Sequence, residues 1–421
     1  MKSAPDSASV PQSPIPWLPE VPEGWTLVRN KAFLRLTDEK VGERKQDFPL
    51  LSLSKQGVII RDVSEGKGKF PKDFDTYLVV RPNNLVFCLF DIEETPRTVG
   101  LVKNVGMLTG AYTNFEVNQS IVLPQFAYYY YLFVDDGKRL APYYTGLRKV
   151  VKTNTFFSLM FPLPPLPEQR AIVAFLDEKC AKIDQLIAAK KREVELLREL
   201  KQAIIAEEVT GAALERNRPT GVFWQPSMPD GWRVRKLRHV LKKLDRARTE
   251  GAELLVCTNK GKVVKRGDAK IGLVSEDESI YQGVAKGDLL IHGMDTWHGA
   301  IAVSDLDGMC TPVVHVCDSS EDKHFIAYCL QNMARGRLFK LISNGVRQNT
   351  SDFRSWEKVA PLPIVLPPLD EQRAIVARIG ERSAKIDAAA AKLESEAEAL
   401  KEWRERLIAD AVTGKRRIAW K

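Results

Sequence analysis

The sequence contains few of the residues that support covalent or metal chemistry. Among its 421 residues are six cysteines, with no Cys-x-x-Cys pair, and five histidines. Scattered cysteines argue against a disulfide framework and favour a reducing compartment, predicted here to be the cytoplasm. No stretch reaches the roughly 18 uncharged apolar residues that a membrane-spanning helix needs, which excludes a bilayer protein. Neither a Walker A motif nor a glycine-rich dinucleotide fingerprint occurs.

The remaining composition is that of an ordinary globular protein with an excess of positive charge. Hydrophobic residues make up 44% and charged residues 28%, and the net charge is +9. This length exceeds what one core supports and predicts two to four domains. Residues 1–16 are rich in Ser and Pro and lack the apolar segment of a signal peptide, so they are predicted to form a loose arm. The charge hints at nucleic acid without identifying it.

An internal repeat organises the chain. Residues 163–174 read LPPLPEQRAIVA and residues 366–377 read LPPLDEQRAIVA, with eleven of twelve positions identical. The offset of 203 persists to Val-Thr-Gly at 209–211 and 412–414, so no insertion or deletion lies between. Upstream, Trp17 with Pro-Glu-Gly-Trp matches Trp224 with Pro-Asp-Gly-Trp at an offset of 207. The chain is therefore two copies of one plan, each containing a variable region of about 140 residues.

After each repeated block, apolar residues alternate by three and four, as in a coiled-coil heptad. The predicted core positions are Val173, Leu176, Ile183, Ile187, Val194, Leu197 and Ile204 in the first copy, and Val376, Ile379, Ile386, Leu393, Leu400 and Leu407 in the second. About 40 residues give helices on the order of 60 Å long. A generic coiled coil or a helical bundle would show the same pattern, but two similar helices in one chain favour an intramolecular antiparallel pair.

The predicted fold class is α+β, with two globular α/β regions separated by two long helices that form an antiparallel coiled coil in a pseudo-twofold repeat. The predicted segments are an N-terminal arm (1–16), the first globular region (17–161), the first helix (162–211), a linker (212–223), the second globular region (224–364), the second helix (365–414) and a basic tail (415–421). Strands are expected within 50–60, 76–81, 85–90, 254–257, 288–292 and 300–303, and helices at 126–131 and 325–330. The positive charge is concentrated in the globular regions and the tail.

The doubled block, followed each time by a heptad helix ending in Val-Thr-Gly, resembles the specificity subunit of type I DNA restriction–modification systems. The resemblance covers residues 17–414. Gly287-Asp288-Leu289-Leu290 and Gly345-Val346-Arg347-Gln348-Asn349 also resemble recurrent segments of that family. The first region departs from them, with Asn83-Asn84 and Gly146-Leu147-Arg148-Lys149 at the matching places.

The resemblance implies a target recognition domain in each globular region, each reading one half of a bipartite target in double-stranded DNA while the coiled coil sets the spacer. It implies two modification subunits and restriction subunits as partners. This chain would be non-catalytic and would bind no cofactor; S-adenosylmethionine, ATP and Mg²⁺ would belong to partner subunits that methylate adenine N6 and cleave DNA. The absence of an Asn-Pro-Pro-aromatic motif agrees. The alternative is an intramolecular coiled-coil scaffold whose globular ends bind protein partners.

Several basic and polar residues are candidates for DNA contact. Arginine suits guanine, and glutamine or asparagine suits adenine, whereas lysines in flexible loops suit phosphates. The candidate base-contacting residues are Arg148, Lys149, Lys152, Arg347, Gln348 and Asn349, and the candidate phosphate-contacting residues are Lys67, Lys69, Lys260, Lys262, Lys265 and Arg266. His292, which follows a strand-like run, could also reach DNA. Each could equally belong to a solvated surface loop.

Two further patterns favour a structural interpretation. Cys310, His315 and Cys317 invite a zinc interpretation, but their spacing matches no standard zinc module and the first region has no counterpart. No metal site is therefore predicted. The tyrosines at 128–131 could stack on bases, yet the flanking Phe126 and Leu132 favour a core helix.

Overall fold

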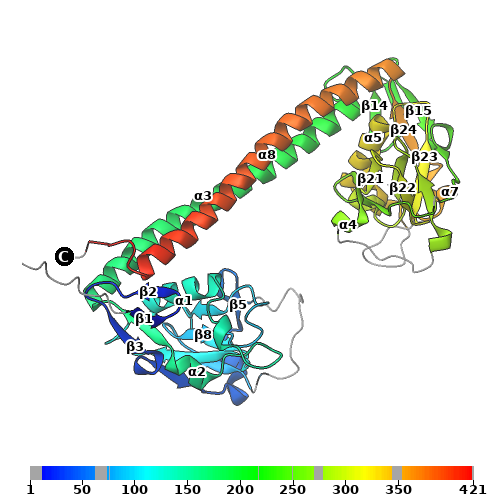
Figure 1. Ribbon diagram of the computed structural model, residues 1–421. Coiled ribbons are helices and arrows are strands. Elements are labelled where there is room, and N and C mark those ends of the chain that lie inside the picture. Colours follow the sequence, from blue (N-terminus) through cyan, green and yellow to red (C-terminus); the bar gives the residue numbers. More distant parts are fainter. Residues whose placement is uncertain are drawn as a thin grey trace, which may run out of the picture. The chain divides into compact units, whose positions relative to one another are not determined.

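The structure is a computed structural model that describes residues 12–61, 74, 76–216, 218–248, 250–269, 278–343 and 353–419 (Figure 1). The chain divides into two compact units. Unit 1 comprises Met1–Lys190 and Ser395–Lys421, and unit 2 comprises Lys191–Glu394. Each unit therefore holds one globular region and part of both long helices. Within the described parts, no helix combines the length and apolar character needed to cross a membrane.

The two long helices are α3 (Leu166–Thr210) and α8 (Leu369–Val412). In unit 1, Lys190 pairs with Glu396 at 2.5 Å and Asp184 pairs with Arg404 at 3.0 Å. The residue number rises along α8 as it falls along α3, so the helices are antiparallel. The same order holds in unit 2, where Lys201 lies 2.7 Å from Asp387 and Arg378 lies 2.7 Å from Glu208. These pairs confirm the predicted antiparallel coiled coil.

The predicted heptad positions line the contact between the helices. The buried ones are Leu176, Ile183, Ile187, Val194, Ile204, Ile379, Ile386 and Leu407, and the partly buried ones are Val173, Leu197, Val376, Leu393 and Leu400. Ile172, Ile205, Ile375 and Ile408 are buried as well, at neighbouring heptad positions. The buried stripe is wider at the helix ends because there the helices also pack into the core of each globular region.

The globular part of unit 1 is built on an antiparallel four-stranded sheet in the order β4 (Leu34–Thr37), β11 (Thr113–Val117), β8 (Leu85–Phe87) and β9 (Val99–Leu101). Helix α1 (Pro124–Asp136) packs against β9, and α2 (Thr153–Ser158) follows later in the chain. The core is aromatic: Phe87, Phe115 and Phe156 contact one another and are almost fully buried. Two further strand pairs are β5 (Leu51–Ser54) with β6 (Gly57–Ile60), and β7 (Leu78–Val80) with β10 (Gly106–Leu108).

Unit 2 repeats this topology strand for strand. Its sheet has the order β16 (Lys242–Lys243), β23 (Val314–Asp318), β20 (Leu289–His292) and β21 (Ile301–Val303), and α5 (Lys323–Arg335) packs against β21. Its further elements include β17 (Leu255–Thr258), β18 (Lys262–Lys265), α4 (Arg266–Ala269), η5 (Glu278–Ile280), β19 (Gln282–Val284), η6 (Thr296–His298), β22 (Gly308–Cys310), α6 (Leu338–Leu341) and α7 (Trp356–Val359). The matching order confirms that the two halves share one fold.

The structure corrects the predicted boundaries at three places. The expected strand over 50–60 is the β5–β6 hairpin, because the chain reverses at Lys55-Gln56 and enters β6 through Gly57, which has a positive φ of 99°. The predicted linker 212–223 contains β13 (Arg218–Val222), which pairs with β14 (Gln225–Met228). The predicted N-terminal arm likewise contains β1 (Gln12–Ile15), which pairs with β2 (Leu18–Glu20). Trp17 and Trp224 therefore belong to hairpins that begin earlier.

The repeated motifs meet in space within each unit. Strand β3 (Thr26–Arg29), which follows Pro-Glu-Gly-Trp, pairs with β12 (Met160–Leu163) in the Pro-rich entry to α3. Strands β15 (Arg233–Lys236) and β24 (Pro363–Leu366) repeat this pairing before α8. Each long helix therefore begins from a strand that is paired to the start of its globular region.

The glutamine of the repeated Glu-Gln-Arg block is a buried connector. Gln169 accepts a hydrogen bond from the Leu123 N–H at 2.8 Å, and its amide donates to the carbonyls of Ile121 at 3.1 Å and Pro164 at 2.9 Å. Gln372 accepts from the Asp322 N–H at 2.9 Å and donates to the Pro367 carbonyl at 2.9 Å. Each amide thus fixes the chain before α1 or α5 to the start of a long helix.

The glycine of each Val-Thr-Gly motif ends a long helix against the other copy's tryptophan motif. Gly414 has a φ of +70°, and a side chain there would come within 2.3 Å of Pro22 Cγ. Gly211 has a φ of +62° and would meet Pro229 Cγ at 2.7 Å. Only glycine suits both the left-handed backbone and the close approach. In each unit, the helix end comes from one half of the sequence and the motif it contacts comes from the other.

Candidate nucleic-acid interface

The loop that carries Arg148 and Lys149 is a narrow, well-supported turn in unit 1. Thr145 and Val150 bond each other in both directions, with N···O distances of 2.9 and 3.0 Å. Arg148 lies 2.6 Å from a carboxylate oxygen of Asp91, and Lys149 forms an ion pair with Glu93. Both predicted DNA-contacting cations thus have carboxylate partners within the unit.

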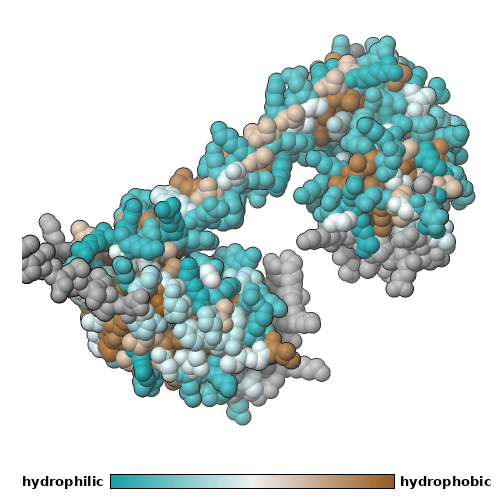
Figure 2. All heavy atoms as spheres, viewed as in Figure 1, coloured by the Kyte–Doolittle hydropathy of each residue, from teal (hydrophilic) through white to brown (hydrophobic). Residues whose placement is uncertain are grey.

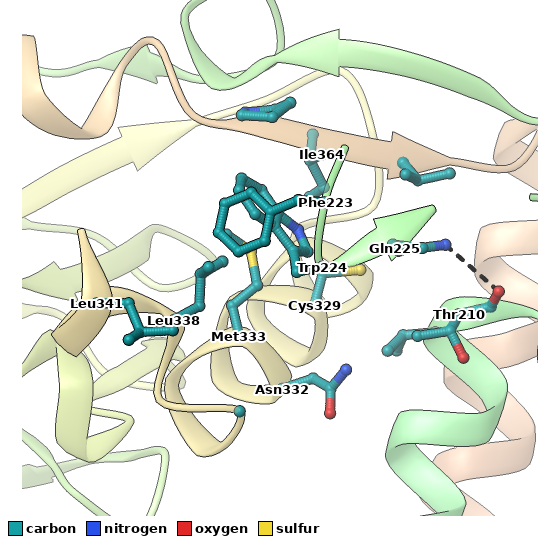
Figure 3. A pocket seen from close by; sticks show the side chains of 14 residues that line it. Thr210, Phe223, Trp224, Gln225, Cys329, Asn332, Met333, Leu338, Leu341 and Ile364 are labelled. Atoms are coloured by element: carbon teal, nitrogen blue, oxygen red, sulfur yellow. Dashed lines mark hydrogen bonds between the residues drawn. The ribbon is translucent and has the colours of Figure 1, made fainter. Parts of the chain in front are cut away.

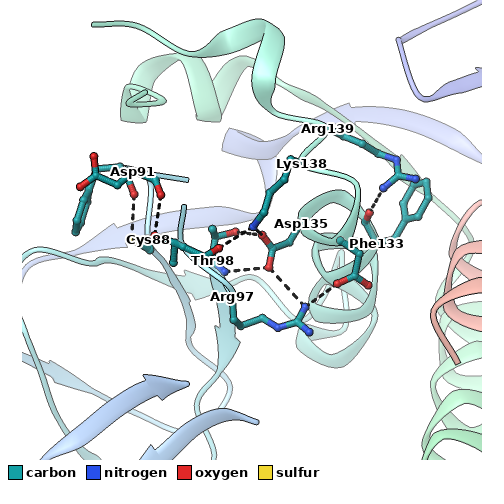
Figure 4. Close-up of polar contacts among 11 residues, drawn as sticks. Cys88, Asp91, Arg97, Thr98, Phe133, Asp135, Lys138 and Arg139 are labelled. Atoms are coloured by element: carbon teal, nitrogen blue, oxygen red, sulfur yellow. Dashed lines mark hydrogen bonds and ion pairs between the residues drawn. The ribbon is translucent and has the colours of Figure 1, made fainter. Parts of the chain in front are cut away.

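A buried polar network supports the segment that holds this loop (Figure 4). The Asp135 side chain is 2% exposed, and it accepts hydrogen bonds from Thr98 N at 2.9 Å and Lys138 Nζ at 2.7 Å. Lys138 also donates to the Thr95 carbonyl at 2.8 Å, and the Thr95 hydroxyl donates to the Asp91 carbonyl at 2.8 Å. The end of α1 is therefore connected by hydrogen bonds to the turn that pairs with Arg148.

The other predicted loop residues divide between exposed and undescribed positions. Lys152 is exposed immediately before α2. Arg347, Gln348 and Asn349 lie outside the described residues, as do Lys67 and Lys69, so their contacts stay predictions.

The β17–β18 hairpin presents the predicted lysines of unit 2. Lys260 is exposed at its tip, where Gly261 has a φ of +67°, and Lys262 and Lys265 are exposed on β18. Lys265 lies 3.9 Å from Glu253. Arg266 begins α4, and its backbone N–H donates to the Leu254 carbonyl at 2.8 Å.

The equivalent hairpin of unit 1 also carries a lysine that sequence reasoning missed. The β5–β6 tip is Lys55-Gln56, between the paired Ser54 and Gly57, and the β17–β18 tip is Asn259-Lys260-Gly261, between the paired Thr258 and Lys262, so a lysine lies in both turns. Lys55 is exposed. Only the alignment of the two hairpins in space reveals the correspondence, because the sequences of these strands hardly match.

His292 lies at the end of β20 in a locally bonded turn. Its Nδ1 accepts a hydrogen bond from the Asp295 N–H at 3.1 Å, and its side chain is 18% exposed. Burial lowers the pKa of His292, which favours the neutral imidazole. Trp297, which follows in the same segment, is partly buried and packs against the core of unit 2.

A polar groove of about 570 Å³ in unit 1 gathers residues that no local pattern connects. It brings together Arg35, Arg81, Asn83 and Gln119, the side-chain types that recognise guanine and adenine edges. Arg81 lies 2.6 Å from Glu39, and its hydrogen bond, with that of Arg44, lowers the pKa of Glu39 to about 2. The sequence offered no signal for this groove because its residues come from separate strands and turns.

Among the described residues, no three His, Cys, Asp or Glu side chains are grouped to hold a metal ion. Cys310, Cys317 and Cys329 are buried, and burial raises the pKa of Cys310 and of Cys317 to about 12. These thiols are therefore protonated at neutral pH and poor nucleophiles.

The two units differ next to the tryptophan of their first hairpin, which is β1–β2 in unit 1 and β13–β14 in unit 2. In unit 2, an apolar pocket of about 230 Å³ lies between Trp224, Cys329 and Ile364, with the exposed Phe223 at its rim (Figure 3). Tyr130 and Phe161 take the matching positions in unit 1, where Trp17 Nε1 donates to Tyr130 Oη at 3.0 Å. Larger rings thus occupy the corresponding space in unit 1, while the surrounding frame is the same.

Comparisons with known proteins agree with this geometry. Residues 98–196 match the family model described as the type I restriction modification DNA specificity domain. The specificity subunit of the StySPI type I restriction enzyme from Salmonella potsdam is 24% identical over 285 residues, which cover 64% of this chain and 60% of the relative. The chain thus spans about three fifths of that relative's length in the match.

A solved structure shows the same fold. A structure described as the structural basis underlying complex assembly and conformational transition of the type I R-M system matches with a TM-score of 0.67 and 16% identity, covering 94% of this chain and all of that one. The HsdS subunit from Thermoanaerobacter tengcongensis matches with a TM-score of 0.47 and 17% identity over 94% of this chain and 98% of that one.

The repeated fold and the paired helices thus occur in a chain whose residues 98–196 match a DNA specificity domain. The chain resembles the specificity subunits of type I restriction–modification systems, as its doubled block predicted, and residues 98–196 carry the similarity to their DNA specificity domain. The matched domain is a recognition domain, which supports the prediction that this chain is not an enzyme.

Proposed function

We propose that this chain is the DNA-recognition subunit of a type I restriction–modification complex, in which each unit reads one half of a bipartite target. The observation that supports this most strongly is that the two units share their frame strand for strand and differ in their exposed tips. Two recognition domains that share a fold but differ in surface suit two different half-sites. Two identical domains would instead favour a palindromic target.

The helical pair is suited to set the spacer between the half-sites. Helix α3 has 45 residues and α8 has 44, and both continue from one unit into the other. A continuous helix of that length extends on the order of 65 Å, more than the roughly 34 Å of one DNA turn. Ion pairs between α3 and α8 occur in both units, which favours a stiff connection.

The helices also carry equivalent exposed apolar residues. Leu200 on α3 and Trp403 on α8 occupy the same position of the repeat, 203 residues apart, and they are 49% and 52% exposed. Figure 2 shows apolar (brown) spheres among polar ones along the helical pair. We assign these positions to the docking of two modification subunits, one at each. Restriction subunits would join that complex, and S-adenosylmethionine, ATP and Mg²⁺ would be bound by the partner subunits.

Binding to random duplex DNA as a function of salt tests DNA recognition against the scaffold alternative. A protein that neutralises six or more phosphates loses about 10³-fold in affinity between 50 and 200 mM salt, and protein docking need not. We expect that loss for the assembled complex. Lys260→Ala with Lys262→Ala should reduce the log–log slope by about two, whereas Lys392→Ala, on the exposed surface of α8, should not change it. Salt-independent affinity would favour the scaffold.

A further inference from the structure

Leu147 is the most exposed large apolar side chain among the described residues. Its exposed fraction is 103%, so no neighbouring residue covers it. It lies between Gly146 and Arg148 at the tip of the turn in unit 1. A single exposed leucine on a mobile surface loop needs no explanation. A leucine presented on a tightly held tip is a different case.

The tip is held by the segment from Leu89 to Glu93. The Asp91 N–H donates to the Arg148 carbonyl at 2.8 Å, and the Val151 N–H donates to the Leu89 carbonyl at 2.9 Å. The guanidinium of Arg148 also lies 5.0 Å from the centre of the Phe90 ring. These contacts add to the ion pairs of Arg148 and Lys149, and they leave Leu147 as the projecting group.

The backbone of the turn is strained in a way that its surroundings must maintain. Lys149 has a φ of +48° and Asp91 a φ of +47°, values that non-glycine residues rarely adopt. Such conformations persist where neighbouring contacts hold them, and they are concentrated at functional sites. Here the contacts are the Lys149–Glu93 and Arg148–Asp91 pairs, each of which ties one of the two strained residues to the segment that carries the other.

The chemistry of the tip selects a particular feature of DNA. Because the cations beside Leu147 are paired with carboxylates, its isobutyl group is the unpartnered feature of the tip. The apolar group on base edges in the major groove is the 5-methyl of thymine.

We propose that Leu147 contacts the methyl group of one thymine in the half-site read by unit 1 and so determines specificity at that base pair. This inference rests on the proposed function. It differs from the sequence-based expectation, which assigned base contact in this loop to Arg148 and Lys149. The ion pairs of those two residues instead hold the turn that presents the leucine.

The test pairs a change in the protein with the removal of one methyl group from DNA. The complex of the full chain with its modification subunits is titrated with its mapped target, in which each thymine in turn is replaced by deoxyuridine. For the wild type, one replacement should weaken binding about fourfold, the equivalent of one buried methyl group. Leu147→Ala should bind the normal target more weakly by a similar factor and lose its sensitivity to that replacement.

Matched controls separate the contact from general effects. Leu214→Ala removes a half-exposed leucine in unit 2, and should leave both the affinity and the deoxyuridine response unchanged. The inference is overturned if no single replacement weakens wild-type binding, or if Leu147→Ala retains the sensitivity. If the wild-type complex shows no preference for any target over random duplex, the proposed function itself is overturned.

Discussion

The indole N–H of Trp25 donates a hydrogen bond to Glu168 Oε1 at 3.1 Å, across 143 residues of sequence. Trp232 donates to Glu371 in the same way, also at 3.1 Å. Each pair joins the Pro-acid-Gly-Trp motif to the Glu-Gln-Arg block, which enclose a variable region between them. The repeated residues therefore close each unit at the start of a long helix, and the sequence between them is free to differ.

Trp25→Phe keeps a ring in the buried site and removes only the hydrogen-bond donor. We expect the free energy of unfolding of unit 1 to fall by about 1.5 kcal/mol, because the lost bond has a charged acceptor. Denaturant unfolding followed by hydrogen exchange of α1 would measure this change. Trp403→Phe, at a half-exposed position, should shift stability by no more than about 0.5 kcal/mol. Equal losses in the free energy of unfolding for the two variants would contradict a stabilising role for the Trp25–Glu168 hydrogen bond.

The stability of unit 2 should depend on pH through His315. This residue is 1% exposed, and its Nε2 lies 2.7 Å from the Phe353 carbonyl. Burial lowers the pKa of His315 below its ordinary 6.5, so the unfolded chain takes up the proton first as the pH falls. The neutral, buried His315 therefore contributes fully to the free energy of unfolding above pH 6.5. Its contribution decreases as the pH falls below 6.5, by at most about 1.4 kcal/mol per pH unit.

Denaturant titrations of the wild type and His315→Thr between pH 7.5 and 5.5 would measure that dependence. Threonine is the residue that unit 1 has at the matching strand position, Thr113. The variant should show a shallower loss of stability on acidification. Identical slopes for the two proteins would show that His315 does not cause the dependence; His292, whose pKa burial also lowers, would then be the remaining candidate.

Leu200→Glu and Trp403→Glu should each remove one modification subunit from the complex. A carboxylate at either exposed position would have to be desolvated on docking, which opposes binding. Native mass spectrometry should show one bound subunit for each single variant and none for the double variant. Leu214→Glu is the control and should retain both. Two subunits retained by both single variants would place the docking surface elsewhere.

Insertion of one heptad into both helices, at matched levels, should lengthen the spacer of the target. Seven residues add about 10.5 Å, which corresponds to about three base pairs. The half-sites should not change because the globular regions are untouched. Selection of bound sequences from a random duplex pool would show the outcome, and an altered half-site would contradict the role of the helices as a spacer.

The sequence predicted the repeated fold and its two long helices because the patterns that indicate them are local or occur twice in the chain. Two signals predicted the long helices and their antiparallel pairing. They are the heptad spacing around Ile183 and Ile386 and the constant offset between the two copies. The hairpins at 12–20 and 218–228 were missed because short strands rich in proline and glycine lack a clear alternation. The ion pair between Arg148 and Asp91 was also missed, since it depends on how two distant turns approach one another. The same holds for the groove that joins Arg35 to Arg81.

Mapping of methylated adenines by single-molecule sequencing tests the central claim most directly. The comparison is between cells that carry the wild-type complex and cells in which residues 224–364 are replaced by those of a relative. The account predicts a target of two short blocks with a fixed spacer, of which the exchange alters one block and leaves the other block and the spacer unchanged. A change in both blocks, or a target that is not divided, would contradict it.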